Sequence, residues 1–254
     1  MAISFVKAQA LGNDFIILEA SPLNSDQIRH IAHRRYGIGC DQVVFFQRSD
    51  NQQLVTVQFY NADGTEAEAC GNGSRALVTL LGQGARQPLL ITLKTKNREL
   101  ECEYDQGLAT INMGSAQTSD SDVPLLATQV GLWGAVNVGN PHLIAFVKNL
   151  DLIDIESIGA RLEHHPAFPN RVNVSVAEVQ ANKIILKTWE RGAGYTGACG
   201  TAACATAALA HTRGLVTDQV SVVQLGGELT ITPTPQNIKM SGAATLVFKG
   251  EIEL

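Results

Sequence analysis

Two nearly identical short segments lie 129 residues apart in this chain of 254 residues. Both read Ala-Cys-Gly, at positions 69–71 and 198–200, and small residues and a helix-forming run follow each of them. Each segment therefore predicts a thiol, Cys70 or Cys199, at the point where a loop becomes a helix. The repeat constrains the fold, because two halves that arose by duplication adopt the same architecture.

The repeat extends beyond the two cysteines. A polar residue precedes each cysteine by nine positions, a second lies 26 or 28 residues upstream, and a Gly-Asn pair begins each half. The matching pairs are Asn13 with Asn140, Gln42 with Asn173, and Asn61 with Glu190. Because these pairs occur in the same order and at similar spacings in both parts of the chain, they favour duplication into halves of roughly 120 residues, a normal domain size. We expect the first half to cover residues 1–116 and the second 117–244, with the seam in the Ser/Thr/Asp-rich stretch 114–123.

Short strands dominate the predicted secondary structure. Segments with alternating or β-branched residues between turn signals predict strands at 55–60, 89–94, 99–104 and 108–113. Residues 220–248 show the same pattern. Helices are predicted at 25–34, 71–82, 152–161 and 200–213. The last of these is apolar all round, which is typical of a buried helix. We therefore expect the two helices that begin at the cysteines to run through the middle of sheets.

Composition excludes several function classes. The net charge is −5, only 17% of the residues are charged, and no basic stripe or Lys/Arg-rich amphipathic stretch indicates nucleic acid or a membrane surface. The longest apolar runs have the length of strands rather than of a membrane span. The first residues lack the pattern of a signal peptide, so we expect a cytoplasmic protein.

Five cysteines without a Cys-x-x-Cys motif do not suggest a disulfide scaffold. The six histidines do not join them at zinc spacing, so no metal is expected. No sequence pattern indicates a pyridoxal site, and the Gly-x-Gly pairs lack the context of a dinucleotide loop. We therefore expect no cofactor.

A cysteine at a helix N-terminus faces unsatisfied backbone N–H groups and the positive end of the helix dipole, which favour its thiolate form. The same N–H groups can hold a substrate carboxylate, and the glycine after each cysteine lets a ligand approach the backbone. Two such thiols across an interdomain cleft suit inversion of an α-carbon: one thiolate removes the α-proton and the opposite thiol returns a proton to the other face.

The remaining cysteines have simpler interpretations. Cys102 in a predicted strand and Cys204 in a predicted helix are expected to be packing residues. Cys40 adjoins Asp41 and Gln42 and is a candidate to line the cleft. His142 either tunes a cysteine or holds a loop.

Seven motifs together resemble the diaminopimelate epimerase family, in family order from residue 12 to about residue 205. They are Gly-Asn-Asp-Phe at 12–15, Gly-Ile-Gly-Cys-Asp-Gln at 37–42, the run at 61–73, Gly-Asn-Pro-His at 139–142, Arg-Val-Asn at 171–173, Glu-Arg-Gly-Ala-Gly at 190–194, and Ala-Cys-Gly-Thr at 198–201.

The resemblance implies a pyridoxal-independent epimerase that interconverts LL- and meso-diaminopimelate for lysine and peptidoglycan precursors. It implies Cys70 and Cys199 as the two bases. It also implies substrate contacts from Asn13, Gln42, Asn61, Gly71, Asn72, Asn140, Asn173, Glu190, Arg191, Gly200 and Thr201.

The fold implied by the resemblance is α+β. Two pseudo-symmetric domains each curl a mainly antiparallel sheet or barrel around a central helix, and the active site occupies the interdomain cleft. The C-terminal strand, 245–254, is expected to return to the first domain. Family members are typically homodimers.

Three positions depart from the family pattern: Ala69, Ala202 and Tyr195, which stands where a glutamate is usual. Two alternatives remain open. One is a racemase of another amino acid, such as proline or histidine, although proline racemases favour His where this chain has Asn72. The other is a thiol redox or binding protein in which Cys70 and Cys199 form a regulatory disulfide.

Overall fold

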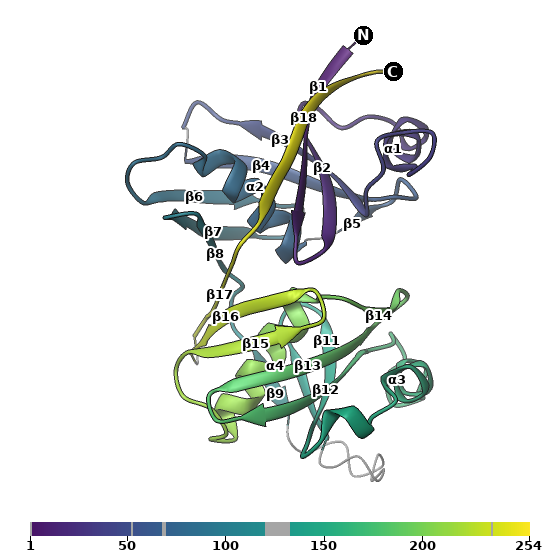
Figure 1. Cartoon of the computed structure of the whole chain (residues 1–254), viewed down its shortest axis with the longest axis vertical. Helices are drawn as coiled ribbons and strands as arrows, with labels where there is room; N and C mark the ends of the chain where they lie inside the picture. Colours follow the sequence, from purple (N-terminus) through teal and green to yellow (C-terminus); the bar gives the residue numbers. More distant parts are fainter. Residues whose placement is uncertain (1, 52, 68–69, 120–132, 235) are drawn as a thin grey trace. The chain divides into compact units, whose positions relative to one another are not determined.

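The computed structural model describes residues 2–51, 53–67, 70–119, 133–234 and 236–254. The chain divides into two compact units (Figure 1). Unit 1 comprises Met1–Asn112 with Ser241–Leu254, and unit 2 comprises Met113–Met240. No helix within the described ranges is long and apolar enough to span a membrane.

Unit 1 is a curled, mainly antiparallel sheet with strand order β18–β1–β2–β3–β4–β6–β7–β8. Within this order of described strands, the β2–β3 and β4–β6 pairs are parallel and the other pairs are antiparallel. The strands are β1 (Ala2–Ala10), β2 (Asn13–Glu19), β3 (Gln42–Arg48), β4 (Leu54–Asn61), β6 (Leu89–Lys94), β7 (Glu99–Asp105), β8 (Leu108–Asn112) and β18 (Thr245–Glu253), with a short β5 (Glu66–Ala67) beside β4. The crossovers contain α1 (Ser25–Ala32) and α2 (Gly71–Gly82).

Unit 2 repeats this arrangement element by element. Its strand order is β9–β10–β11–β12–β13–β15–β16, and β11–β12 and β13–β15 are again the parallel pairs. The strands are β9 (Gln117–Ser119), β10 (Trp133–Asn137), β11 (Pro141–Val147), β12 (Asn173–Gln180), β13 (Lys183–Glu190), β14 (Gly194–Thr196), β15 (Val220–Gln224) and β16 (Gly227–Pro233). β17 (Ile238–Gly242) begins in unit 2 and its last two residues belong to unit 1. The crossovers contain α3 (Ile155–Glu163) and α4 (Gly200–Thr212). The predicted α+β class with pseudo-symmetric curled sheets is confirmed.

Two strands pair in a different unit from the strand that precedes them in the chain. β9 follows β8 of unit 1 in the chain but pairs with β10 of unit 2. β18 follows β17 but pairs with β1 along nearly its whole length, from Ala2 opposite Glu253 to Gln9 opposite Thr245. The N- and C-terminal strands therefore lie side by side in unit 1 (Figure 1).

Both central helices are buried. In α2 the residues from Asn72 to Thr79 are all buried, and in α4 the same holds from Ala202 to Ala210. In α4 small side chains make this possible, because a helix enclosed by a curled sheet needs close approach on every side. Gly73 illustrates the constraint: a Cβ atom there would lie 2.8 Å from Cε1 of Phe59 on β4.

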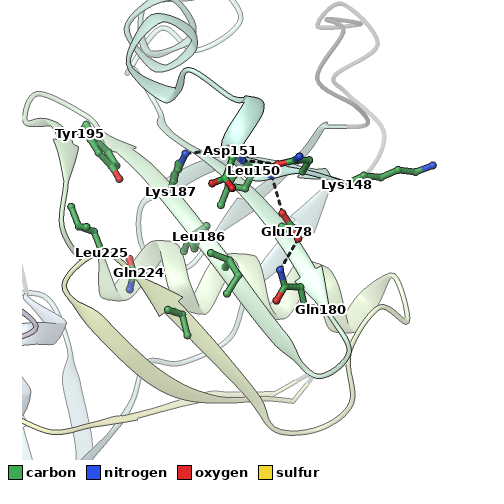
Figure 2. A pocket seen from close by; sticks show the side chains of 13 residues that line it. Lys148, Leu150, Asp151, Glu178, Gln180, Leu186, Lys187, Tyr195, Gln224 and Leu225 are labelled. Atoms are coloured by element: carbon green, nitrogen blue, oxygen red, sulfur yellow. Dashed lines mark hydrogen bonds between the residues drawn. The ribbon is translucent and has the colours of Figure 1, made fainter.

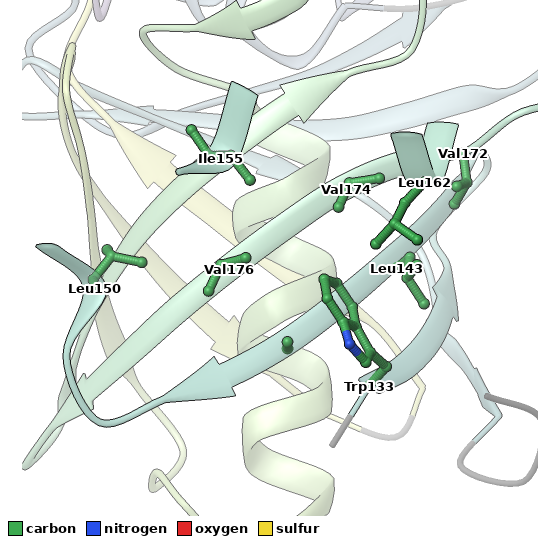
Figure 3. Close-up of a cluster of buried hydrophobic side chains, with 9 residues drawn as sticks. Trp133, Leu143, Leu150, Ile155, Leu162, Val172, Val174 and Val176 are labelled. Carbon is green, nitrogen blue, oxygen red and sulfur yellow. The ribbon is translucent and has the colours of Figure 1, made fainter. Parts of the chain in front are cut away.

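One of the two outer helices begins later than expected. α1 begins at Ser25, as predicted, and Asn24 caps it through a reciprocal capping box with Gln27. The helix predicted from residue 152 begins at Ile155, because Leu150–Leu152 form a separate 3-10 turn and Asp154 is the N-cap that accepts from Ser157 N–H. Leu162 of α3 packs with Trp133, Leu143 and Val174 in a buried cluster (Figure 3).

Candidate functional site

Cys70 is the N-cap residue of α2. Its backbone is extended and its Sγ accepts the N–H of Gly73 at 3.3 Å. The thiol is only partly buried. The first turn of the central helix thus directs an N–H donor at the sulfur, the arrangement that the sequence predicted for this position.

Hydrogen bonds join two amide side chains and one hydroxyl side chain of unit 1 in a chain. Gln42 and Asn61 lie directly opposite each other on β3 and β4. Gln42 Nε2 donates to Asn61 Oδ1 at 3.0 Å, and Asn61 Nδ2 donates to Thr65 Oγ1 at 3.1 Å. Gln42 Oε1 is buried and has no hydrogen-bond partner within the described residues. A strong acceptor is therefore left for a ligand donor.

An ion cluster fixes the loop that carries Asn13. Arg34 contacts Asp14 through two parallel hydrogen bonds of 2.8 and 2.9 Å, and Lys7 donates to the same carboxylate at 2.6 Å. Asp41 accepts Asn13 Nδ2 at 2.8 Å and also pairs with Arg34 at 2.7 Å. Burial by itself raises the pKa of Asp14, but the hydrogen bonds from Arg34 and Lys7 outweigh it and hold that pKa well below its usual range.

Cys199 is the N-cap residue of α4 and is buried. Its Sγ lies 3.5 Å from Thr201 Oγ1. Burial raises the pKa of the Cys199 thiol well above its usual value, and the negative charge of Glu190 raises it further. The second thiol therefore favours its protonated form, although it occupies the same position in the repeat as Cys70.

A hydrogen-bond chain leads from His142 to this thiol. Burial, with a smaller contribution from the charge of Arg191, lowers the pKa of His142 to about 3, so the ring is neutral near pH 7. Its Nε2 lies 3.0 Å from Asn140 Oδ1, and Asn140 Nδ2 donates to Thr201 Oγ1 at 3.3 Å. Because Thr201 accepts this bond, its own hydroxyl hydrogen is available to the Cys199 sulfur.

Asn173 holds two loops together. Its Oδ1 accepts the N–H of Arg191 at 3.0 Å, and its Nδ2 donates to the carbonyl of Pro141 at 3.0 Å. Both polar atoms of the Asn173 amide therefore have hydrogen-bond partners within the protein. The guanidinium of Arg191 donates at 3.0 Å to the carbonyl of Asn170 in the loop before β12, and both residues are exposed.

Glu163 supports this turn from α3. Its buried carboxylate accepts Trp189 Nε1 at 2.7 Å and the N–H of Gly192 at 3.0 Å, and it pairs with Arg171 at 3.4 Å. Burial by itself raises the pKa of Glu163, but the bonds from Trp189 and Gly192 lower it overall, so the group is ionised. The three contacts fix the segment that presents Glu190 and Arg191.

The side chain of Tyr195 on β14 lies on the opposite face of the sheet from the side chain of Glu190 on β13. Thr196, its neighbour on β14, donates to Glu190 Oε1 at 2.5 Å, and successive strand residues point to opposite faces. Tyr195 instead lines a hollow of about 600 Å³ together with Leu225, Leu186 and Lys187 (Figure 2). The departure from the family pattern at this position therefore places no side chain beside Glu190.

The structure thus brings the predicted site residues together within each unit. In unit 1 Gln42 is hydrogen-bonded to Asn61, and in unit 2 Thr201 joins Cys199 to Asn140. Cys102 and Cys204 are buried, as expected of packing residues. Cys40 is also buried, within a cluster that includes Phe5 and Ile16, and burial raises the pKa of its thiol to about 12. Ala69 lies outside the described residues.

Several supporting residues were not found from the sequence. They are Lys7, Asp14, Arg34 and Asp41 of the ion cluster, Glu163, and the buried Arg75, whose Nη2 donates to Asn72 Oδ1 at 2.9 Å. Among the described residues, no group of three or more His, Cys, Asp or Glu side chains could hold a metal ion.

Comparisons with known proteins identify one family. A model described as diaminopimelate epimerase matches residues 5–119 and 134–247. The diaminopimelate epimerase of Sphingopyxis alaskensis is 41% identical over 100% of this chain and 98% of its own length, and that of Zymomonas mobilis is 36% identical over the same shares.

Two solved structures share the fold. A PhzF-family phenazine biosynthesis protein of Bacillus anthracis has a TM-score of 0.76 at 18% identity, with 100% of both chains covered. A hydroxyproline epimerase of Agrobacterium vitis has a TM-score of 0.73 at 14% identity, with 99% of this chain and 92% of that chain covered.

The ion cluster of unit 1 predicts a stability effect. We expect Asp14→Asn to lower the free energy of unfolding by about 2 kcal/mol, less than for a fully buried pair because Arg34 is 58% exposed. The contribution of Asp14 is present above its ordinary pKa of 3.8 and is lost as the pH falls from there towards the lowered value. The difference between the variant and the parent protein should therefore be largest near pH 7 and shrink below about pH 4.

Urea denaturation at a series of pH values measures this difference. Asp26→Asn is the matched control, because Asp26 is paired with Arg29 on an exposed helix face and its side chain is 88% exposed. We expect little change from it at any pH. An equal loss of stability in both variants, or a difference from the parent that does not depend on pH, would contradict the role assigned to Asp14.

Proposed function

Because the chain belongs to the diaminopimelate epimerase family, we propose that it interconverts LL- and meso-diaminopimelate by a two-thiol mechanism without pyridoxal. The observation that carries the mechanism is the position of the two thiols. Cys70 and Cys199 occupy equivalent places in a repeated fold, each as the N-cap residue of a buried central helix. The carboxylate of an amino acid fits the N–H groups of such a helix start.

The proposed reaction transfers one proton out and one proton in. The thiolate of one cysteine takes the α-proton, and the electron pair of the broken C–H bond is delocalised into the α-carboxylate. The thiol of the other cysteine then gives its proton to the opposite face of the α-carbon, and its sulfur becomes the thiolate. Backbone donors around the carboxylate stabilise the carbanion, provided that water is excluded. The reaction requires the two sulfurs on opposite faces of one carbon.

The two environments support opposite protonation states at rest. The N–H of Gly73 is directed at Cys70 Sγ, which stabilises a thiolate more than a thiol. Burial and the carboxylate of Glu190 favour the thiol at Cys199. We propose that Cys70 is the resting base and Cys199 the resting acid, and that they exchange roles in the reverse reaction.

Polar groups in each unit match the rest of the substrate. Asn13 and Asn61 in unit 1, together with the open acceptor Gln42 Oε1, suit the hydrogen-bond donors of an amino acid. Gly71 and Asn72 in α2, and Gly200 and Thr201 in α4, present helix N–H groups to its carboxylate. In unit 2, Glu190 suits an ammonium and Arg191 a second carboxylate. In this proposal Asn140 and Asn173 orient Thr201 and Arg191 through their hydrogen bonds.

The wider assignments follow from the family. We propose that the two units are the two halves of the epimerase, that the protein acts as a cytoplasmic homodimer, and that it serves lysine and peptidoglycan precursor synthesis. None of these roles requires nucleic acid or a cofactor.

Proton NMR of LL-diaminopimelate in D2O with the reduced protein tests the proposal. We expect the α-proton signal to disappear as meso-diaminopimelate forms. If no exchange occurs although both thiols titrate as free, diaminopimelate is not the substrate. The same assay with proline and histidine then tests a different racemase, and inertness towards all of them favours a thiol protein without α-proton chemistry.

Loss of either thiol should abolish inversion. We expect Cys70→Ala and Cys199→Ala each to lower kcat by about a thousandfold or more, because proton abstraction and return need both groups. Circular dichroism should show an intact fold in both. Cys204→Ala is the matched control, since Cys204 is buried in the middle of α4, and it should keep near-normal activity. Full activity in either of the first two variants would refute the two-base assignment.

Arg191→Lys should weaken substrate recognition. A lysine keeps the charge but cannot form two parallel hydrogen bonds to a carboxylate, so we expect kcat/KM to fall about tenfold or more, mainly through KM. Arg161→Lys on the exposed side of α3 is the control and should change neither constant. Steady-state kinetics that give the same kcat/KM for Arg191→Lys and the parent protein would place Arg191 outside the substrate site.

A further inference from the structure

Gln224 links a hairpin of unit 2 to the second thiol. It is the last residue of β15, is 7% exposed, and its Oε1 accepts the N–H of Cys199 at 2.8 Å. The bond fixes the orientation of the amide, because only the oxygen can accept. Figure 2 shows Gln224 beside Leu225, where β15 ends.

A second hydrogen bond joins the same two segments. The N–H of Gly226, in the turn between β15 and β16, donates to the carbonyl of Gly197 at 2.7 Å. The hairpin turn is therefore bound to the loop before α4 at two points, one backbone and one side chain. Together they determine where the backbone of Cys199 enters the helix.

The residue of unit 1 that is equivalent to Gln224 makes different hydrogen bonds. The parallel pairs place Lys183 opposite Ser221 in unit 2 and Leu54 opposite Thr92 in unit 1, so Gln224 corresponds to Thr95 in the repeat. The Thr95 hydroxyl donates to the carbonyl of Arg98 at 2.7 Å and accepts its N–H at 3.2 Å, both within its own turn. Gln224 in unit 2 therefore contacts the backbone of the second cysteine, whereas the equivalent Thr95 in unit 1 bonds within its own turn.

The two thiols also differ in what holds their sulfurs. Cys70 Sγ accepts a helix N–H, whereas Cys199 has no side-chain capping bond and its Sγ contacts the Thr201 hydroxyl. The first turn of α4 therefore meets the sulfur of Cys199 mainly through a side-chain hydroxyl rather than through a capping N–H. The place of this sulfur also depends on how the backbone of residue 199 is held.

We propose that Gln224 is a positioning residue for Cys199: by accepting the Cys199 N–H it sets the position of the second thiol for proton transfer. The inference rests on the proposed function for its catalytic consequence, but the contact itself can be tested separately. A neutral amide suits this position, because an anion so close to Cys199 would add to the negative charge of Glu190 and further disfavour the thiolate.

Two substitutions separate geometry from charge. Gln224→Met keeps the length of the side chain but removes the amide acceptor, so the Cys199 N–H loses its partner. Gln224→Glu keeps an acceptor oxygen and the shape. It removes no hydrogen bond made by the amide nitrogen, since Gln224 Nε2 has none within the described part of the chain. Its main effect is the added charge.

The first measurement is steady-state epimerisation. For Gln224→Met we expect kcat to fall about tenfold while KM stays within about threefold, because a misplaced acid or base slows the chemical step more than binding. For Gln224→Glu we expect the pH profile of kcat to shift to higher pH by about one unit, because a nearby negative charge disfavours the thiolate. A residue that only stabilised the fold would shift neither the kcat-to-KM relation nor the pH profile.

The second measurement is the rate of iodoacetamide alkylation at each thiol, followed by mass spectrometry of the peptides. Cys70 in the same molecule is the internal reference. We expect the Cys199-to-Cys70 ratio of rates to change in both variants and to fall several-fold at pH 9 in Gln224→Glu. Ser221→Ala, on the same strand, removes only an exposed bond to Glu228, and Thr95→Val is the equivalent change in unit 1. Both controls should leave Cys199 unaffected.

The outcomes discriminate clearly. An unchanged ratio of alkylation rates together with kcat within twofold of the parent in Gln224→Met would overturn the proposal. If that variant fails to fold, Gln224→Glu decides, and an unchanged ratio and pH profile there would overturn it. If the parent protein does not epimerise diaminopimelate, the proposed function fails, whereas the alkylation ratio still reports on Gln224 alone.

Discussion

Each unit depends on one arrangement: the N-terminus of a helix enclosed by a curled sheet. The first N–H groups of a helix have no partner within it, and burying them without acceptors is unfavourable. In α2 and α4 the residue at this point is a cysteine, whose sulfur is a weak acceptor. In the proposed function, the carboxylate of the substrate is a further acceptor at each helix start. The small residues of α4 and the close packing of Gly73 against Phe59 follow from the same enclosure.

The two units support this arrangement with different chemistry. Unit 1 uses ion pairs, in which Asp14 and Asp41 bind two loops to Arg34 and hold Asn13. Unit 2 uses a buried carboxylate, Glu163, that accepts an indole N–H and a backbone N–H. In both cases the carboxylate stays ionised because donors compensate for burial. Rigid support of this kind matters at a catalytic site, where small displacements have large effects on rate.

The repeat was predictable from the sequence because it is local and periodic. The spacing of the cysteines and their polar partners located both central helices, and the lack of Asp, Glu, Lys and Arg in 200–212 indicated the burial of α4. The supporting contacts were not predictable in this way. Glu163 meets Trp189 and Gly192 only through the fold, 26 and 29 residues away, and Gln224 meets Cys199 across 25 residues. Pairings of this kind depend on strand register, which no local pattern of residues specifies.

A symmetric fold must still produce two unlike thiols, because inversion in the proposed mechanism needs one proton acceptor and one proton donor at a time. The differences arise at equivalent positions of the repeat. Asn61 in unit 1 corresponds to the carboxylate Glu190 in unit 2, whose charge favours the thiol form of Cys199. Gly73 provides the N–H for Cys70, whereas Thr201 provides the hydroxyl for Cys199. Duplication thus supplies the geometry, and single substitutions within it supply the acid–base asymmetry that the chemistry requires.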